Sequence, residues 1–161
     1  MRSWIVHANA PFRTSSNWYF QDFLSELRPC FVPSSPYVLS HRILDKESAR
    51  VHLTDVGRLK ERRFLTYLFD GWEDALKRSL YGSVAAEVKQ LPIVLGLNDM
   101  TGQRGNVPTL LDTTQKAVDA MDVGDMLNFI AVTTDNPTTM QAYRRELQNK
   151  YYWLLVSKYS V

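Results

Sequence analysis

Two aspartates follow apolar runs that are typical of β-strands. Asp70 comes directly after the run FLTYLF at residues 64–69, and Asp135 comes directly after the run LNFIAVTT at residues 127–134. Because the carboxyl ends of neighbouring parallel strands meet at one edge of a sheet, we expect both carboxylates to face one crevice. Carboxylate oxygens are the ligands that Mg²⁺ and Mn²⁺ prefer. The pattern therefore predicts that Asp70 and Asp135 are metal ligands and catalytic residues for phosphoryl transfer.

Each of the two acids also has a simpler interpretation. Asp70 and Gly71 form a dipeptide that is common in turns. Asp135 precedes a predicted helix, whose positive N-terminal end favours an acid. The residue pattern alone leaves the catalytic and the structural interpretations open.

The composition is typical of a soluble globular protein. The chain has 161 residues, of which 22% are charged and 45% are hydrophobic, enough for one domain or one domain and an extension. The net charge of +2 is too small to indicate nucleic-acid binding by itself. Cys30 is the only cysteine, which excludes an internal disulfide and a Cys-rich zinc site and fits a reducing compartment. We therefore expect a nuclear or cytoplasmic protein that is neither secreted nor embedded in a membrane.

The elements that must position the two acids begin near residue 64. Residues 1–63 have helical patterns and are predicted to form a small helical region, with one helix capped by Ser15 or Ser16 and another by Ser35. Residues 64–161 are predicted to form the second domain. Its first three strands, at residues 64–69, 79–88 and 91–97, are joined so tightly that they must be antiparallel neighbours.

The rest of the second domain alternates helices and strands. A helix is predicted from Pro108 to Gly124, then the strand that leads to Asp135, then a helix with Asn136 as its N-cap and Pro137 as its first residue. A last strand is predicted at residues 153–156. The fold class is therefore α/β: an RNase H-like mixed sheet of three antiparallel strands followed by two parallel strands with crossover helices. The first and fourth strands lie side by side in this arrangement.

Several basic residues are candidates for nucleic-acid contact. Arg144 and Arg145 could join this set, which consists of Arg62, Arg63, Lys77, Arg78 and Arg104. Acidic residues are interleaved with these cations, so a solvated face of mixed charge is the alternative interpretation. The loop at residues 98–106 contains Gly102 and Gly105 but lacks the glycine fingerprints of phosphate-binding loops.

Four segments, in order and at the expected spacing, resemble the catalytic domain of hAT-superfamily transposases, fungal members most of all. The segments are FDGW at 69–72, LYGSVAAEV at 80–88, VLGLNDMTG at 94–102 and TTDNPTTM at 133–140. Shorter segments, PFR at 11–13 and PSSP at 33–36, resemble the helical region that precedes that domain. The similarity covers nearly the whole chain.

The resemblance implies an RNase H-like fold and metal-dependent cutting and joining of DNA by two aspartates and one glutamate. Asp70 matches the first acid and Asp135 the second, with Mg²⁺ or Mn²⁺ as the implied cofactor. The Cys/His set of the family's N-terminal zinc finger is missing, and so is the part after residues 153–156 that carries the glutamate; neither Glu87 nor Glu146 stands at its place.

We therefore expect a truncated, transposase-derived domain that is catalytically incomplete alone. One alternative is a non-catalytic interaction protein that binds protein or DNA or associates with itself. Another is a nuclease that recruits a further carboxylate.

Overall fold

Helices make up the N-terminal part of the chain. The computed structural model describes residues 8–103, 105–135 and 137–158. It divides the chain into two compact units, Met1–Leu53 and Thr54–Val161, and the division falls inside a helix, earlier than the predicted boundary at residue 63. The helical elements, in chain order, are η1 (Phe12–Ser16), α2 (Trp18–Leu27), α3 (Pro36–Val38), the π-helical turn η2 (Leu39–Ile43) and α4 (Leu44–Glu61).

The predicted cap of α2 was wrong, whereas the cap at Ser35 is confirmed. Asn17 caps α2, and its side chain accepts a hydrogen bond from the backbone N–H of Phe20. The hydroxyls of Ser15 and Ser16 instead donate to backbone carbonyls three residues earlier, inside the 3₁₀ turn η1, so they are not available to cap. Ser35 accepts from the N–H of Val38 and is followed by proline at the start of α3.

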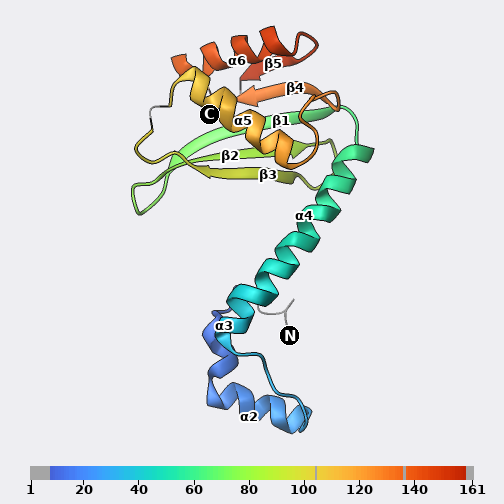
Figure 1. Ribbon diagram of the computed structural model, residues 1–161, viewed down its shortest axis with the longest axis vertical. Helices are drawn as coiled ribbons and strands as arrows, with labels where there is room; N and C mark the ends of the chain where they lie inside the picture. Colours follow the sequence, from blue (N-terminus) through green and yellow to red (C-terminus); the bar gives the residue numbers. More distant parts are fainter. Residues whose placement is uncertain (1–7, 104, 136, 159–161) are drawn as a thin grey trace. The chain divides into compact units, whose positions relative to one another are not determined.

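A five-stranded sheet forms the framework of the second unit (Figure 1). Its strands are β1 (Leu65–Glu73), β2 (Ser79–Ala86), β3 (Ile93–Asp99), β4 (Phe129–Thr134) and β5 (Leu155–Lys158), in the order β3-β2-β1-β4-β5. The pairs β1–β2 and β2–β3 are antiparallel, and β1–β4 and β4–β5 are parallel. This confirms a mixed α/β sheet in which the first and fourth strands are neighbours.

Some strand bounds differ from the predicted ones. β1 continues through Asp70 to Glu73, so the interpretation of Asp70 and Gly71 as a turn was wrong. The strand continues because Asp70 pairs with Gly82 across the antiparallel ladder. β5 begins at Leu155 instead of Trp153, because a turn in which the N–H of Leu154 donates to the carbonyl of Tyr151 comes first.

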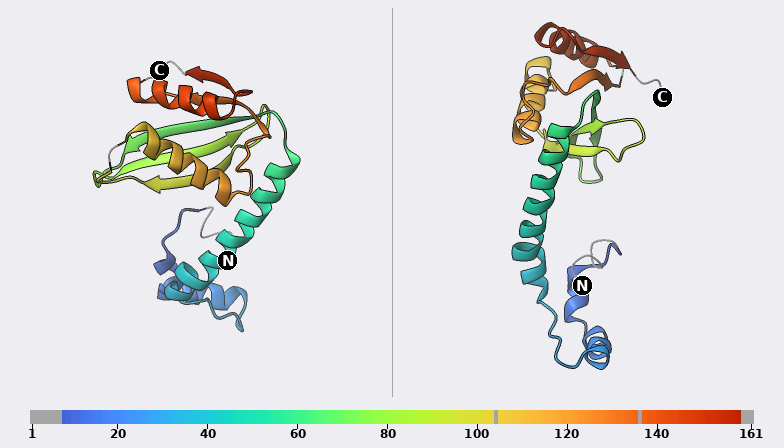
Figure 2. Two further views of the ribbon diagram at one scale, coloured as in Figure 1. Left: turned by 45° about the horizontal axis from the view of Figure 1, so that its top comes forward. Right: turned by 90° about the vertical axis from the view of Figure 1, so that its right-hand side faces the viewer.

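Two crossover helices cover the same face of the sheet (Figure 2). They are α5 (Val107–Ala120) and α6 (Thr138–Lys150). Asn106 caps α5 by accepting from the N–H of Thr109. Pro137 immediately precedes α6 and is not its first residue, and the predicted cap Asn136 lies outside the described residues.

The hydrophobic core lies between the sheet and these two helices. Tyr67, Phe69 and Phe129 point into it from the strands and are fully buried. The predicted buried face of α6 is confirmed, since Met140, Tyr143 and Leu147 all lie in the core. Side chains alternate across a strand, so the neighbours of the buried β1 residues face the other side of the sheet. That second face carries the exposed apolar side chains of Trp72, Val94 and Leu97.

Candidate functional site

The parallel pairing of β1 with β4 brings the two predicted acids together. The register pairs Leu68 with Thr133 and Phe69 with Thr134, so the next residue of each segment is an aspartate. Asp70 belongs to β1 and is exposed, whereas Asp135 follows the end of β4 and is half-buried. The two carboxyls are close enough for the charge of Asp70 to raise the pKa of Asp135.

The Asp135 carboxyl is in an unfavourable electrostatic environment. Burial is the main cause that raises its pKa, the negative charge of Asp70 raises the pKa further, and the Arg144 guanidinium partly offsets both effects. Its Oδ1 atom is buried and has no hydrogen-bond partner among the residues that the structure describes. Buried polar atoms are nearly always paired, so an oxygen of this kind needs an explanation.

Asp70 is held in place by its own strand. Its Oδ1 accepts a hydrogen bond from the backbone N–H of Gly71 at 2.9 Å. Gly71 is required at that position, because a Cβ there would lie 2.6 Å from the ring of Tyr81. The local backbone is therefore fixed by packing, and the carboxylate is left exposed to solvent.

Arg144 is a site residue that the sequence interpretation misplaced. It was named as a residue that could join a phosphate-facing surface, but its side chain is buried. Its Nη1 donates to Thr134 Oγ1 at 2.6 Å and to the carbonyl oxygen of Asp135 at 2.7 Å. Arg144 therefore fixes the backbone that carries Asp135. A signal was present, because Arg144 is four residues after the buried Met140 and so shares its helix face.

In the described part of the chain, no further ligand joins the acid pair to make a conventional metal cluster. Among the described residues, no group of three or more His, Cys, Asp or Glu side chains could hold a metal ion. Glu87 is in an ion pair with Arg62 at 3.5 Å, and Glu146 is exposed on α6. Both carboxylates fit a divalent cation by chemistry, but they supply only part of a coordination shell.

Most of the candidate basic residues face partners within the chain. Lys77 pairs with Glu73 at 2.8 Å, and Arg78 pairs with Asp74 at 2.6 Å. Arg62 forms an ion pair with Glu87, and Arg63 donates to Asn128 Oδ1 at 3.3 Å. Arg104 lies outside the described residues. These pairs favour the mixed-charge interpretation, and nucleic-acid contact at these positions stays a prediction.

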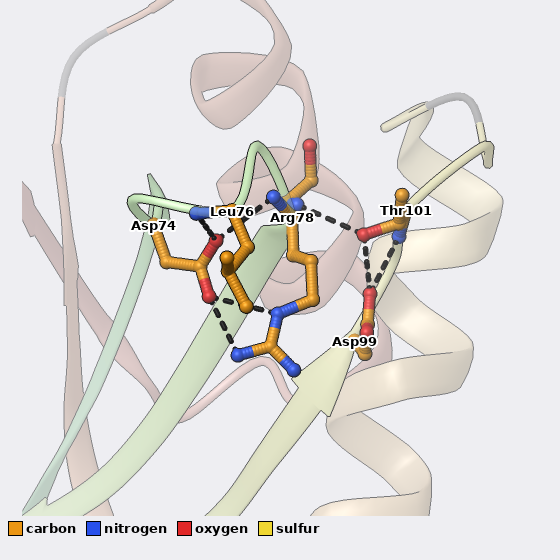
Figure 3. A network of polar contacts seen from close by, with 6 residues as sticks. Asp74, Leu76, Arg78, Asp99 and Thr101 are labelled. Atoms are coloured by element: carbon orange, nitrogen blue, oxygen red, sulfur yellow. Dashed lines mark hydrogen bonds and ion pairs between the residues drawn. The ribbon is translucent and has the colours of Figure 1, made fainter.

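A second group of acids near the same end of the sheet is fully engaged in structure (Figure 3). Asp74 accepts from the backbone N–H and the guanidinium of Arg78, and these hydrogen bonds lower the pKa of Asp74. Asp99 accepts from the hydroxyl and the N–H of Thr101, which lowers the pKa of Asp99. The network anchors the β1–β2 turn beside the end of β3, so these acids are not free to act in the site.

The strand order and the one-sided helices define a mixed α/β protein with an acid pair at its central parallel strands. No protein-family model matches the chain, and no curated protein matches it either. Within the described part of the chain, none of the helices has the length and apolar character needed to cross a membrane.

Proposed function

We propose that this chain is a transposase-derived domain with an RNase H-like fold, related to DNA cutting and joining, that acts in the nucleus or cytoplasm. In this proposal Asp70 and Asp135 bind Mg²⁺ or Mn²⁺. The single observation that carries it is the buried, unpartnered oxygen of Asp135 beside a second carboxylate, at the point where the parallel pairing of β1 with β4 ends. The order of the five strands and the resemblance of four segments to hAT transposases support the same proposal.

A divalent cation would relieve both electrostatic costs at this site. Its charge would offset the mutual repulsion of the two carboxylates, and coordination would satisfy the buried Oδ1 of Asp135. Such an ion would supply activation of a water or a 3′-hydroxyl and stabilisation of the leaving oxygen of a phosphodiester. The chain's own contribution is positional: Gly71 fixes Asp70, and Arg144 fixes the backbone of Asp135.

The proposed activity is incomplete in the isolated chain. No third acid joins the pair among the described residues. Metal ions in such sites need all of their ligands, so the loss of one acid removes most of the rate. We therefore expect metal binding without efficient strand cleavage.

The metal site is tested by titrating the purified chain with Mn²⁺ in a calorimeter. The wild type should bind Mn²⁺ saturably, and both Asp70→Asn and Asp135→Asn should abolish binding. Asp112→Asn is the matched control, because Asp112 is exposed on α5 and pairs with Lys116 outside the site. A well-folded wild type that does not bind Mn²⁺ would disprove the metal site.

DNA is the macromolecular partner in this proposal, and it is tested separately. Affinity for a fluorescent DNA duplex should fall strongly between about 50 mM and about 200 mM salt, because phosphate contacts release counterions. The absence of binding at the lower salt concentration would count against DNA as the partner.

A second candidate function is a non-catalytic interaction protein that reuses the fold. It is favoured by the apolar side chains of Trp72, Val94 and Leu97, which are exposed on the sheet face opposite the helices. A wild-type chain that binds another protein but binds neither DNA nor Mn²⁺ would favour this candidate.

A further inference from the structure

A groove crosses the sheet face that α5 and α6 leave uncovered. Its volume is about 420 Å³, and its lining includes the apolar side chains of Leu68, Trp72, Val84 and Val94. Cross-strand pairing places these residues together, because Leu68 pairs with Val84 and Val84 pairs with Val94. The floor of the groove therefore runs across β1, β2 and β3.

Trp72 lines the groove, and its ring packs over a glycine of the neighbouring strand. Gly82 pairs with Asp70 on the neighbouring strand and presents no side chain to the groove. The Trp72 ring lies against Gly82, since a Cβ there would be 3.0 Å from a ring atom. The Trp72 ring therefore occupies the space that a side chain at position 82 would take.

The apolar surface is larger than the groove. Trp72 is 46% exposed, and Val94 and Leu97 are 64% and 61% exposed. Leu97 pairs with Gly82, so this surface continues from the groove to the edge strand β3. Contiguous exposed apolar surface of this kind usually marks an interaction site.

The negative charge of the groove indicates which kind of partner it fits. Asp70 is the one charged residue among the described residues that line it, and Asp135 adds a second negative charge beside Asp70. A second copy docked face to face would bury the acids of both copies in one interface whose described lining holds no basic residue, which is unfavourable. A helix with a basic residue among its apolar residues would cover the patch and pair with Asp70.

We infer that this groove binds an amphipathic α-helix of another protein, with a lysine or arginine of that helix facing Asp70. The apolar residues of the helix occupy the floor formed by Leu68, Val84 and Val94, in the manner of helix-in-groove recognition. The basic residue compensates the carboxylate that the helix would otherwise cover unpaired. Asp70 is shared with the proposed metal site, so the inference is tested in the absence of divalent cations; the apolar floor supplies no metal ligands.

The test uses two labelled helical peptides of about 18 residues that present a stripe of leucines at helical spacing. One has a lysine in the centre of the stripe, and the matched peptide has a glutamate there. Binding is measured by fluorescence anisotropy, and the binding site is mapped by backbone amide shifts of the isotope-labelled full chain. The lysine peptide should bind at least about tenfold more tightly than the glutamate peptide, the effect of one favourable charge contact.

Three variants distinguish binding in the groove from non-specific binding. Val94→Glu should weaken binding of the lysine peptide at least about tenfold, because it places a charge on the apolar floor. Asp70→Asn should remove the difference between the two peptides without abolishing binding. Val88→Glu is the control, because Val88 is 84% exposed and lies outside the groove lining, so binding should not change.

Several results would overturn the inference. The absence of saturable binding by either peptide below about 1 mM is one. Equal effects of Val94→Glu and Val88→Glu are another. If Val94→Glu does not fold, an unchanged peptide preference in Asp70→Asn is sufficient to reject the helix and its basic residue. Concentration-dependent dimerisation that Val94→Glu abolishes would instead assign the face to a second copy.

Discussion

At the scale of single residues, the carboxyl of Asp135 is the most informative group. Its raised pKa has two causes that add, burial and the neighbouring Asp70, and one that opposes them, Arg144. Arg144 lies on the helix side of the sheet, and its guanidinium donates to the backbone carbonyl oxygen of Asp135. The side chain is therefore held at a defined place while its charge is only partly compensated.

Asp135→Asn should stabilise the chain at neutral pH in the absence of divalent cations. Because the folded-state pKa is raised above the unfolded value of about 3.9, the folded chain binds more protons between the two pKa values. Stability therefore falls as pH rises through that window and stays lower above it. Urea unfolding midpoints of wild type and variant, measured from about pH 3 to about pH 8, should converge at the acidic end. A variant that is less stable at neutral pH would contradict this assignment.

At the scale of secondary-structure elements, a chain of buried hydroxyls joins the sheet to both helices. Thr114 of α5 lies within 2.6 Å of the Tyr143 hydroxyl on α6 and accepts from Tyr67 of β1 at 3.2 Å. The Tyr67 hydroxyl also lies 2.8 Å from that of Ser83 on β2. Burial raises the pKa of both phenols, so they stay protonated and able to donate at ordinary pH.

Tyr143→Phe should lower the free energy of unfolding by about 1 to 2 kcal/mol, because it leaves a buried hydroxyl of Thr114 with one partner fewer. Tyr152→Phe is the matched control. Tyr152 is exposed, so loss of its hydroxyl should have no measurable effect on the free energy of unfolding. Chemical unfolding of both variants checks the difference. Equal stabilities of the two variants would mean that the hydroxyl chain does not stabilise the packing of α6.

Two glycines should respond in opposite directions to alanine. Gly71→Ala should destabilise the chain by about 1 to 3 kcal/mol, because the new Cβ would overlap the ring of Tyr81. Gly57→Ala should stabilise it by about 1 kcal/mol, since Gly57 lies in α4, has no atom within 4 Å of an added Cβ, and is a poor helix former. Thermal unfolding of both variants is sufficient, and the same sign for both would contradict the contacts.

The elements also explain what the sequence could and could not predict. The antiparallel order of β1, β2 and β3 was predictable because their links are too short for a crossover. The adjacency of Asp70 and Asp135 followed from the predicted crossover helix, which returns the chain to a parallel neighbour of the first strand. The extension of β1 through Asp70 and Gly71 was not predictable, because it depends on pairing with β2 and on the Tyr81 ring. The burial of Arg144 likewise depends on acceptors from a different segment.

At the scale of the whole molecule, the two candidate activities share one residue. Asp70 belongs to the acid pair and also lines the apolar groove, whereas Asp135 belongs only to the pair. Asp135→Asn should therefore abolish Mn²⁺ binding and leave the preference for the lysine peptide largely intact. Val94→Glu should have the reverse effect. The two proposals can thus fail independently.

The division of the chain inside α4 predicts that residues 54–161 fold alone. Every residue of the hydrophobic core cluster, and every hydrophobic residue packed against it, lies at position 56 or beyond. Leu59, in the last turns of α4, is fully buried in this core, so the shorter chain keeps the contacts that stabilise the sheet. The fragment should therefore give a dispersed amide spectrum and a Tm within about 4 °C of the full chain's main transition, the shift expected for about 1 kcal/mol.

In the same fragment Leu59→Ala should lower the free energy of unfolding by about 2 to 5 kcal/mol, because it opens a cavity in the core. A fragment that is unfolded, or one that tolerates Leu59→Ala without loss of stability, would show that the core needs residues before Thr54 or does not include α4.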